Sequence, residues 1–125
     1  MGREQPTSGV LTSPNYPQRY FNNHDVVQRI QVPEGNWIKI RFTAYEVEAE
    51  HDTVTVSDKF GGTLAVFDGG AKSEDDWRNE IVSKTDKFEV RFHTDESGRE
   101  KGWRLDWGES RVISHDFAMF FNRNG

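Results

Sequence analysis

A corner built on two prolines constrains the fold more than any other part of this sequence. Residues 9–17 (GVLTSPNYP) begin as a short apolar strand signal and run directly into a turn. Each proline fixes its own φ angle and favours an extended conformation at the residue before it, so Ser13 and Tyr16 are directed away from the helical region. The pattern predicts an early edge strand that ends in a rigid corner.

Alternation of apolar and polar residues continues from about residue 10 to about residue 109, and no long stretch keeps helical spacing. The turn at residues 33–36 (PEGN) predicts a hairpin between the strands on either side of it. Further strand pairs are expected between 54–56 and 64–67, and between 79–85 and 88–92. With a last strand around residue 105, about eight or nine short strands indicate an all-β, antiparallel two-sheet β-sandwich.

Size and charge exclude several classes of function. The 125 residues suit one domain, and the net charge of −5 provides no uniform basic surface for nucleic acid. No apolar segment approaches the length that inserts into a membrane. The sequence contains no cysteine, so it has no disulfide framework and cysteine usage leaves the compartment open. An acidic chain of this kind favours a cationic partner or a metal ion.

Several landmarks follow one another in a specific order: the corner at 9–17, then Val32-Pro33-Glu34-Gly35, then 52–56, then Phe67-Asp68-Gly69, and finally Gly102-Trp103. This series resembles the CUB domain, an extracellular β-sandwich module with a jelly-roll-like fold. The resemblance implies a CUB-like domain over residues 8–109, an N-terminal extension at 1–7 and a C-terminal tail or linker at 110–125. It also implies an extracellular or secreted protein, although this chain shows no signal peptide.

The chain departs from the family in its cysteines. The family usually carries two disulfide bridges, and here the first pair has no N-terminal member while its partner position corresponds to Val26. The second pair corresponds to Ala49 and Asp68, and a tryptophan usual in the family is replaced by Gln28. Because such bridges typically contribute a few kcal/mol each, the core or a bound ion must hold that end. Trp37, Trp103 and Trp107 are the large side chains available for the core.

Acidic residues follow two strand signals. Glu46, Glu48, Glu50 and Asp52 alternate along one segment, and Asp95 with Glu96 follows the strand that ends near His93. In a two-sheet sandwich these segments can lie at the same end, where carboxylates repel one another and a hard divalent cation relieves the conflict. The simpler interpretation is a solvated acidic strand end.

Many CUB domains bind calcium through one glutamate and two aspartates, and the resemblance assigns these roles to Glu48, Asp52 and Asp95. Ser97 or a neighbouring carbonyl would supply a further oxygen. By the resemblance, Ser8 stands where the family often has an aromatic residue that supports the glutamate, and loss of such support can weaken metal affinity by about tenfold or more. We therefore expect a weak calcium site, with a dissociation constant of about 0.1 to 1 mM.

In calcium-binding members of the family the same acidic residues accept a lysine from a protein partner. The resemblance implies a noncatalytic, calcium-dependent protein-interaction module that holds a Lys or Arg of its partner. The candidate partner-binding residues are Tyr45, Glu46, Glu48, Asp52 and Asp95. Each such contact is weak alone, which suits a module that works by multivalency.

Three alternatives stay open. Carbohydrate binding is one, with Trp77 as the candidate for stacking on a sugar because its polar loop gives it little structural reason to be aromatic. A structural matrix or self-assembly module is another, in which the apolar run 117–121 would support a weak homo-oligomer. A zinc site could use His51 and His93 with Asp52 or Asp95. An enzyme is not expected, because no nucleophile elbow or metalloprotease helix motif occurs.

Overall fold

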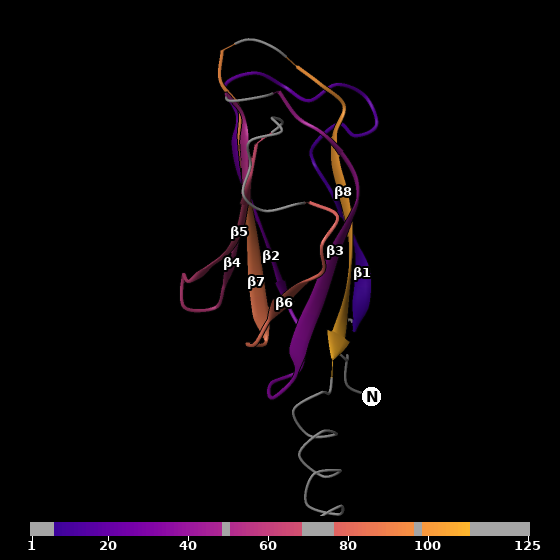
Figure 1. The fold of residues 1–125 in the computed structure, drawn as a ribbon, viewed down its shortest axis with the longest axis vertical. Coiled ribbons are helices and arrows are strands. Elements are labelled where there is room, and N and C mark those ends of the chain that lie inside the picture. The colour runs from indigo at the N-terminus through magenta and orange to yellow at the C-terminus, as the bar shows by residue number, and fades with distance from the viewer. Residues whose placement is uncertain (1–6, 49–50, 69–76, 97–98, 111–125) are drawn as a thin grey trace, which may run out of the picture.

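The computed structural model describes residues 7–48, 51–68, 77–96 and 99–110. These residues form eight β-strands, which Figure 1 labels. The strands are β1 (Ser8–Thr12), β2 (Asp25–Gln31), β3 (Trp37–Glu46), β4 (Thr53–Asp58), β5 (Thr63–Phe67), β6 (Ile81–Ser83), β7 (Lys87–His93) and β8 (Gly102–Ser110). In this part of the chain no helix is long and apolar enough to cross a lipid bilayer.

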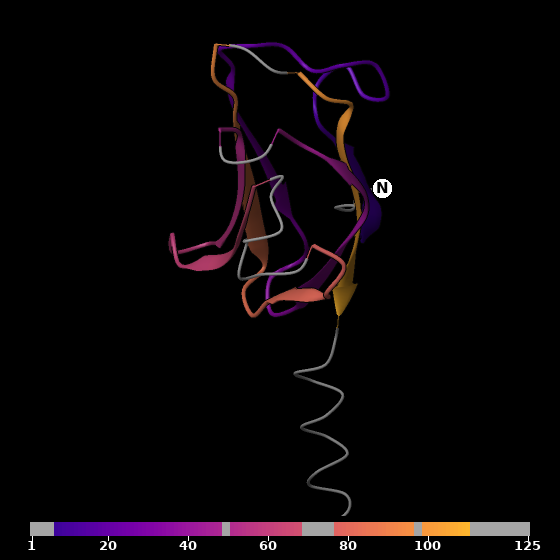
Figure 2. The same cartoon turned by 45° about the horizontal axis from the view of Figure 1, so that its top comes forward.

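Two four-stranded antiparallel sheets pack face to face, which confirms the all-β sandwich. One sheet has the strand order β1-β8-β3-β6 and the other has the order β2-β7-β4-β5. The two layers and the loops that join them at the upper end are visible in Figures 1 and 2. The expected extension at 1–7 and tail at 110–125 fall almost wholly outside the described residues.

The proline corner fastens the end of β1 to the start of β8. The backbone N–H of Ser13 donates to the carbonyl of Trp103 (2.9 Å), and the Trp103 N–H donates back to Oγ of Ser13 (3.0 Å). Gly102 has a φ of 98°, and a Cβ at this position would lie 1.9 Å from Oγ of Ser13. Only glycine fits here, because it tolerates this φ and leaves room for the fully buried serine.

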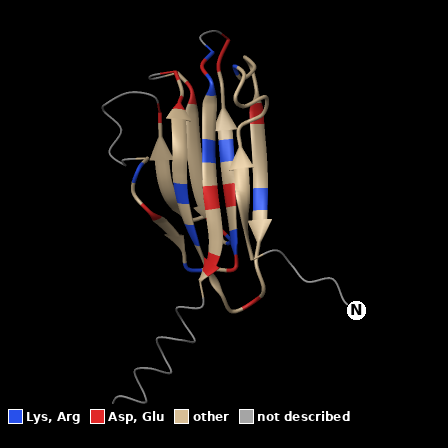
Figure 3. Ribbon diagram, turned by 90° about the vertical axis from the view of Figure 1, so that its right-hand side faces the viewer, with Lys and Arg blue, Asp and Glu red and all other residues tan. Residues whose placement is uncertain are grey.

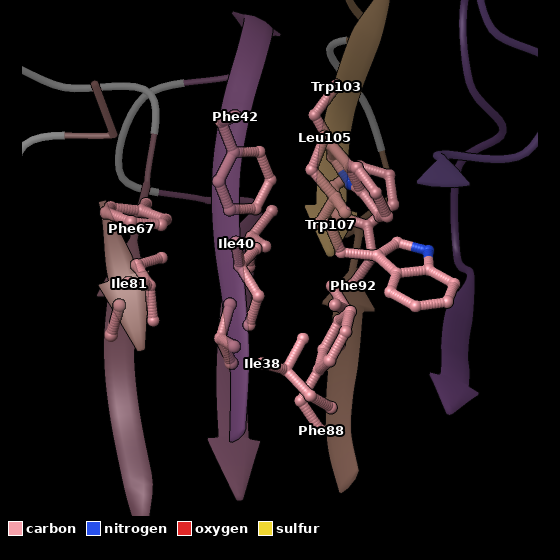
Figure 4. Packing of buried hydrophobic residues seen from close by; sticks show 14 of the residues in the cluster. Ile38, Ile40, Phe42, Phe67, Ile81, Phe88, Phe92, Trp103, Leu105 and Trp107 are labelled. Carbon is pink, nitrogen blue, oxygen red and sulfur yellow. The ribbon is translucent and has the colours of Figure 1, made fainter. Parts of the chain in front are cut away.

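Aromatic and branched side chains fill the space between the sheets. The largest fully buried side chains include Trp103, Tyr20, Phe67, Phe88 and Phe92. Figure 4 shows residues of β3, β7 and β8 pointing toward one another between the sheets. Trp103 and Trp107 belong to this core, as expected, whereas Trp37 is only half-buried.

Two of the three expected strand pairs are wrong. β4 pairs with β5 as predicted, but β2 and β3 lie in different sheets, and so do β6 and β7. After β2 the N–H of Val32 donates to the carbonyl of Asp86 (2.9 Å), and the chain crosses to the opposite sheet instead of turning back on itself. Alternation identifies the inward face of each strand. That face is buried whether the next strand pairs in the same sheet or lies in the opposite one, so alternation does not predict the partner.

Candidate functional site

Three carboxylates converge at the upper end of the sandwich. Glu48 follows β3, Asp52 precedes β4, and Asp95 follows β7, so each lies where a strand meets a loop. One oxygen from each residue lies within 4.8 Å of the others, and no other group of three potential metal ligands occurs among the described residues. Figure 3 shows acidic segments in red among these upper loops.

Asp52 is the buried member of this cluster. Its side chain is fully buried, and its Oδ2 accepts a hydrogen bond of 2.5 Å from the hydroxyl of Tyr20. The same hydroxyl accepts the backbone N–H of Glu48 (3.0 Å). Burial, together with the hydrogen bond to Asp52, raises the pKa of Tyr20 far above its usual value, so the phenol stays protonated and keeps donating.

Asp95 is held by its backbone. Its N–H donates to Oδ1 of Asp52 (2.9 Å), and its carbonyl accepts the N–H of Asn23 (2.7 Å). The adjacent Thr94 reinforces this position, because its hydroxyl donates to the carbonyl of Phe21 (2.8 Å) and accepts the N–H of His24 (2.8 Å). Hydrogen bonds therefore connect the loops at this end of the sandwich.

The carboxylate of Glu48 lies in an unfavourable electrostatic environment. Its Oε1 is buried and accepts no hydrogen bond within the described residues. Loss of hydration raises the pKa of this carboxyl, the charges of Asp95 and Asp52 raise it further, and His51 opposes the shift. A divalent cation among the three carboxylates would remove the repulsion and give the Glu48 oxygen a partner.

The other predicted site residues occupy different environments. Glu46 is exposed at the end of β3, but the hydroxyl of Tyr45 is buried without a hydrogen-bond partner in the described chain. The ring of Tyr45 packs edge-on against Phe42 and Phe67. The hydroxyl of Tyr45 is therefore not presented to a partner. Ser97 lies outside the described residues.

Trp77 has a structural role that the sequence did not suggest. Its ring stacks on Tyr45 with the centroids 5.9 Å apart, and the guanidinium of Arg78 lies 4.5 Å from its centroid. The side chain is partly buried against the core. These contacts explain an aromatic residue at this position without a sugar ligand.

The expectation about Ser8 was wrong. Ser8 pairs with Gly108 at the start of β1, far along the strand from the corner that reaches the site. Tyr20 instead supports Asp52 and the backbone of Glu48. Tyr20 was not predicted from the sequence because it lies between the corner and β2, where no alternation of apolar and polar residues indicates burial. An aromatic residue in that polar segment was the available signal.

The two histidines of the zinc alternative do not form a group of three metal ligands with the aspartates in the described chain. His51 Nδ1 lies 3.5 Å from Oδ2 of Asp95, but His51 is largely exposed and the carboxylate cluster contains no histidine. His93 is exposed and pairs with Asp25 and Thr53 on neighbouring strands. Within the described chain the site offers oxygen ligands, which suit a hard cation better than zinc.

Comparisons with known proteins agree with this architecture. A model of the CUB domain family matches residues 2–107. Cubilin of the pig, Sus scrofa, is 26% identical over 106 residues, which cover 85% of this chain and 3% of cubilin. The solved CUB1-EGF-CUB2 domain of human MASP-1/3 is 25% identical with a TM-score of 0.77, covering 87% of this chain and 43% of that chain. The MASP-1 CUB2 domain bound to Ca²⁺ has a TM-score of 0.67 and 20% identity, covering 84% of this chain and 95% of that chain.

Proposed function

The chain belongs to the CUB domain family, and we propose that it is a noncatalytic, calcium-dependent binding module that holds a basic side chain of a protein partner. The family consists of interaction modules found in extracellular proteins. Because this chain spans only 3% of the cubilin that it matches, the rest of any parent protein is outside the proposal. We also infer an extracellular location.

The single observation that supports calcium most directly is the environment of Glu48. Its buried Oε1 has no hydrogen-bond partner in the described chain, although it lies in a cluster of three carboxylates. Such an oxygen is costly to leave unsatisfied, and the cost falls if a cation coordinates it. Glu48, Asp52 and Asp95 would hold the ion, with water and carbonyl oxygens completing the six to eight ligands that calcium takes.

These residues of the chain, and not the solved neighbour, support calcium binding. The MASP-1 CUB2 domain is bound to Ca²⁺, but at 20% identity its likeness supports only the fold. In this chain Tyr20 and the Asp95 N–H already fix both oxygens of Asp52. A site whose central ligand is fixed in advance loses less entropy when the ion binds.

The proposed partner chemistry follows from the exposed carboxylates. Glu46 is exposed beside the cluster, and Glu48 and Asp95 are half-buried, so their outer oxygens can face a ligand. A lysine ammonium is a compact charge with three donors and can bridge such oxygens once calcium has ordered them. One lysine contributes little affinity, so binding would depend on several modules or several lysines.

Thermal unfolding in calcium, in magnesium and in chelator tests the ion site. At a tenfold excess of calcium over its dissociation constant we expect about 1.4 kcal/mol of stabilisation, which corresponds to a rise in Tm of several degrees. Glu48→Gln should abolish the calcium-dependent rise, whereas Glu100→Gln, an exposed residue of the same end, should retain it. An unchanged Tm up to about 10 mM calcium contradicts the ion site.

The partner proposal needs a separate measurement. A surface coated with poly-lysine should retain the wild-type protein in calcium and release it in chelator. Glu46→Gln should weaken this retention without changing the calcium-dependent rise in Tm, because Glu46 is outside the ligand cluster. Retention that is equal in calcium and in chelator would indicate unspecific charge attraction and would exclude the proposed mechanism.

A further inference from the structure

The end of the sandwich opposite the carboxylates carries a hollow of about 240 Å³. Three turns converge on it: the β2–β3 turn, the β4–β5 turn and the β6–β7 turn. Its lining includes Trp37, Lys59, Phe60, Lys84, Thr85 and Asp86. This hollow is independent of the calcium proposal.

An aromatic ring is held in solvent at the rim of the hollow. Phe60 is 81% exposed, the highest value among the large exposed hydrophobic residues of the described chain. The turn that carries it is well ordered by hydrogen bonds, because Oδ1 of Asp58 accepts the N–H groups of Phe60 and Gly62, each at 2.9 Å. The N–H of Lys59 also donates to Oγ1 of Thr85 (3.2 Å), which joins two of the three turns.

Ammonium groups accompany the aromatic rings. The Lys84 ammonium lies 5.6 Å from the centroid of Trp37. Lys59 lies 5.9 Å from the centroid of Phe60 and 3.4 Å from Oδ1 of Asp86. That carboxylate is buried and its Oδ1 accepts no hydrogen bond with proper geometry, so the ion pair is its only partner among the described residues. The hollow thus suits a segment that combines aromatic side chains with a carboxylate.

The sequence that follows β8 contains such a segment. β8 ends at Ser110, whose Cα partner on the neighbouring strand is Trp37, a residue of the lining. The sequence that follows carries Asp116 directly before the apolar run 117–121, in which three of the five residues are phenylalanine. From Ser110 to Phe117 a chain spans at most about 25 Å when extended and about 10 Å when helical. Either conformation brings the run within reach of the hollow.

We propose that residues 116–121 dock in this hollow, with their phenylalanines against Phe60 and Trp37 and with Asp116 near Lys84. The connection through Ser110 raises the effective concentration of the segment to the millimolar range, so a modest apolar contact is sufficient. Docking removes an exposed aromatic surface from water and provides a carboxylate for an ammonium that the described chain pairs only with an aromatic ring.

The absence of cysteine allows a direct test in the full-length chain. A nitroxide attached at Asn122→Cys is the only label that a thiol reagent introduces. In chelator, we expect the label to broaden the NMR signals of the Trp37 indole and of the Phe60 and Lys84 amides more than those of the Ser8 and Gly108 amides, which lie at the same end of the sandwich but outside the hollow. Phe60→Ala should reduce this broadening, and Val10→Ala, which removes apolar atoms from an exposed position on β1, should leave it unchanged.

Two results would overturn the proposal. Broadening that is no stronger at the hollow than elsewhere means that the segment does not dock there. In a second sample, ¹⁴N protein that carries the nitroxide is mixed with ¹⁵N protein that carries none. If the signals of the hollow broaden only in this mixture, the segment of a second copy fills the hollow. Because the experiment is done without calcium, neither result depends on the fate of the ion site.

Discussion

The hydroxyl of Tyr20 lies 2.5 Å from Oδ2 of Asp52, and this hydrogen bond joins a loop residue to the buried centre of the carboxylate cluster. Because the same hydroxyl accepts the N–H of Glu48, one phenol sets the positions of two proposed calcium ligands. Its ring is also part of the core, where it packs edge-on against Phe92 with the centroids 4.9 Å apart. Tyr20 therefore connects the stability of the sandwich to the geometry of the site.

Tyr20→Phe tests this connection. The variant keeps the ring but leaves Oδ2 of Asp52 and the Glu48 N–H without their partner, so we expect a loss of about 1–3 kcal/mol in the free energy of unfolding. Calcium affinity should fall by about tenfold to a hundredfold, as is typical when a ligand loses its supporting hydrogen bond. Urea unfolding in chelator and calcium titration measure the two effects. Tyr16→Phe, the same change outside this network, should alter neither.

The raised pKa of Glu48 predicts an unusual pH dependence in the absence of calcium. A carboxyl whose pKa is higher in the folded than in the unfolded state stabilises the fold below its unfolded pKa and loses this contribution as the pH rises through the folded pKa. In chelator, Glu48→Gln should therefore be more stable than the wild type at pH 7, and the difference should disappear near pH 4.

Calcium should reverse that order. The ion binds the charged carboxylates of the wild type, so at pH 7 in saturating calcium the wild type should be more stable than Glu48→Gln. Urea unfolding of both proteins between pH 4 and pH 8, with and without calcium, measures this reversal. If the wild type is the more stable protein at pH 7 in chelator as well, then Glu48 is not electrostatically strained.

Sequence patterns predicted the strands better than their partners. Alternation placed Ile38, Ile40 and Phe42 on one inward face, and the structure buries all three. The tight turn at residues 33–36 nevertheless joins strands of different sheets. Local alternation depends on burial, which both pairings satisfy, whereas the choice of partner depends on contacts such as the one between Val32 and Asp86 that are distant in sequence.

In the site, too, the positions of the ligands were predicted from the sequence, whereas contacts between distant residues were not. The family register identified Glu48, Asp52 and Asp95, and the structure brings their oxygens together. Tyr20 was not predicted, because its role depends on a hydrogen bond between residues 32 positions apart. The packing of Trp77 was likewise not predicted, since its stacking on Tyr45 involves another part of the chain.

Trp77→Ala distinguishes a structural tryptophan from a sugar-binding one. Because the ring stacks on Tyr45 and packs against the core, its removal should lower the free energy of unfolding by at least about 1 kcal/mol. Chemical denaturation in chelator measures this loss. Val66→Ala, at an exposed position of β5, should cost clearly less. A variant as stable as the wild type would reopen the carbohydrate alternative.

Gly102→Ala should be one of the most damaging single substitutions in the described chain. Its φ of 98° strains any other residue, and the new Cβ would lie 1.9 Å from Oγ of Ser13 and 3.1 Å from its Cβ. The hydrogen bonds that fasten β1 to β8 would have to break or shift, so we expect a loss of about 3 kcal/mol or more in the free energy of unfolding.

Gly35→Ala separates the two causes, which are the strained φ and the steric clash, because Gly35 has a similar φ of 94° but nothing within 4 Å of the added Cβ. That control should lose only about 1–2 kcal/mol. Urea unfolding of both variants gives the difference, which measures the steric part, and equal losses would mean that the corner and β8 can separate without cost.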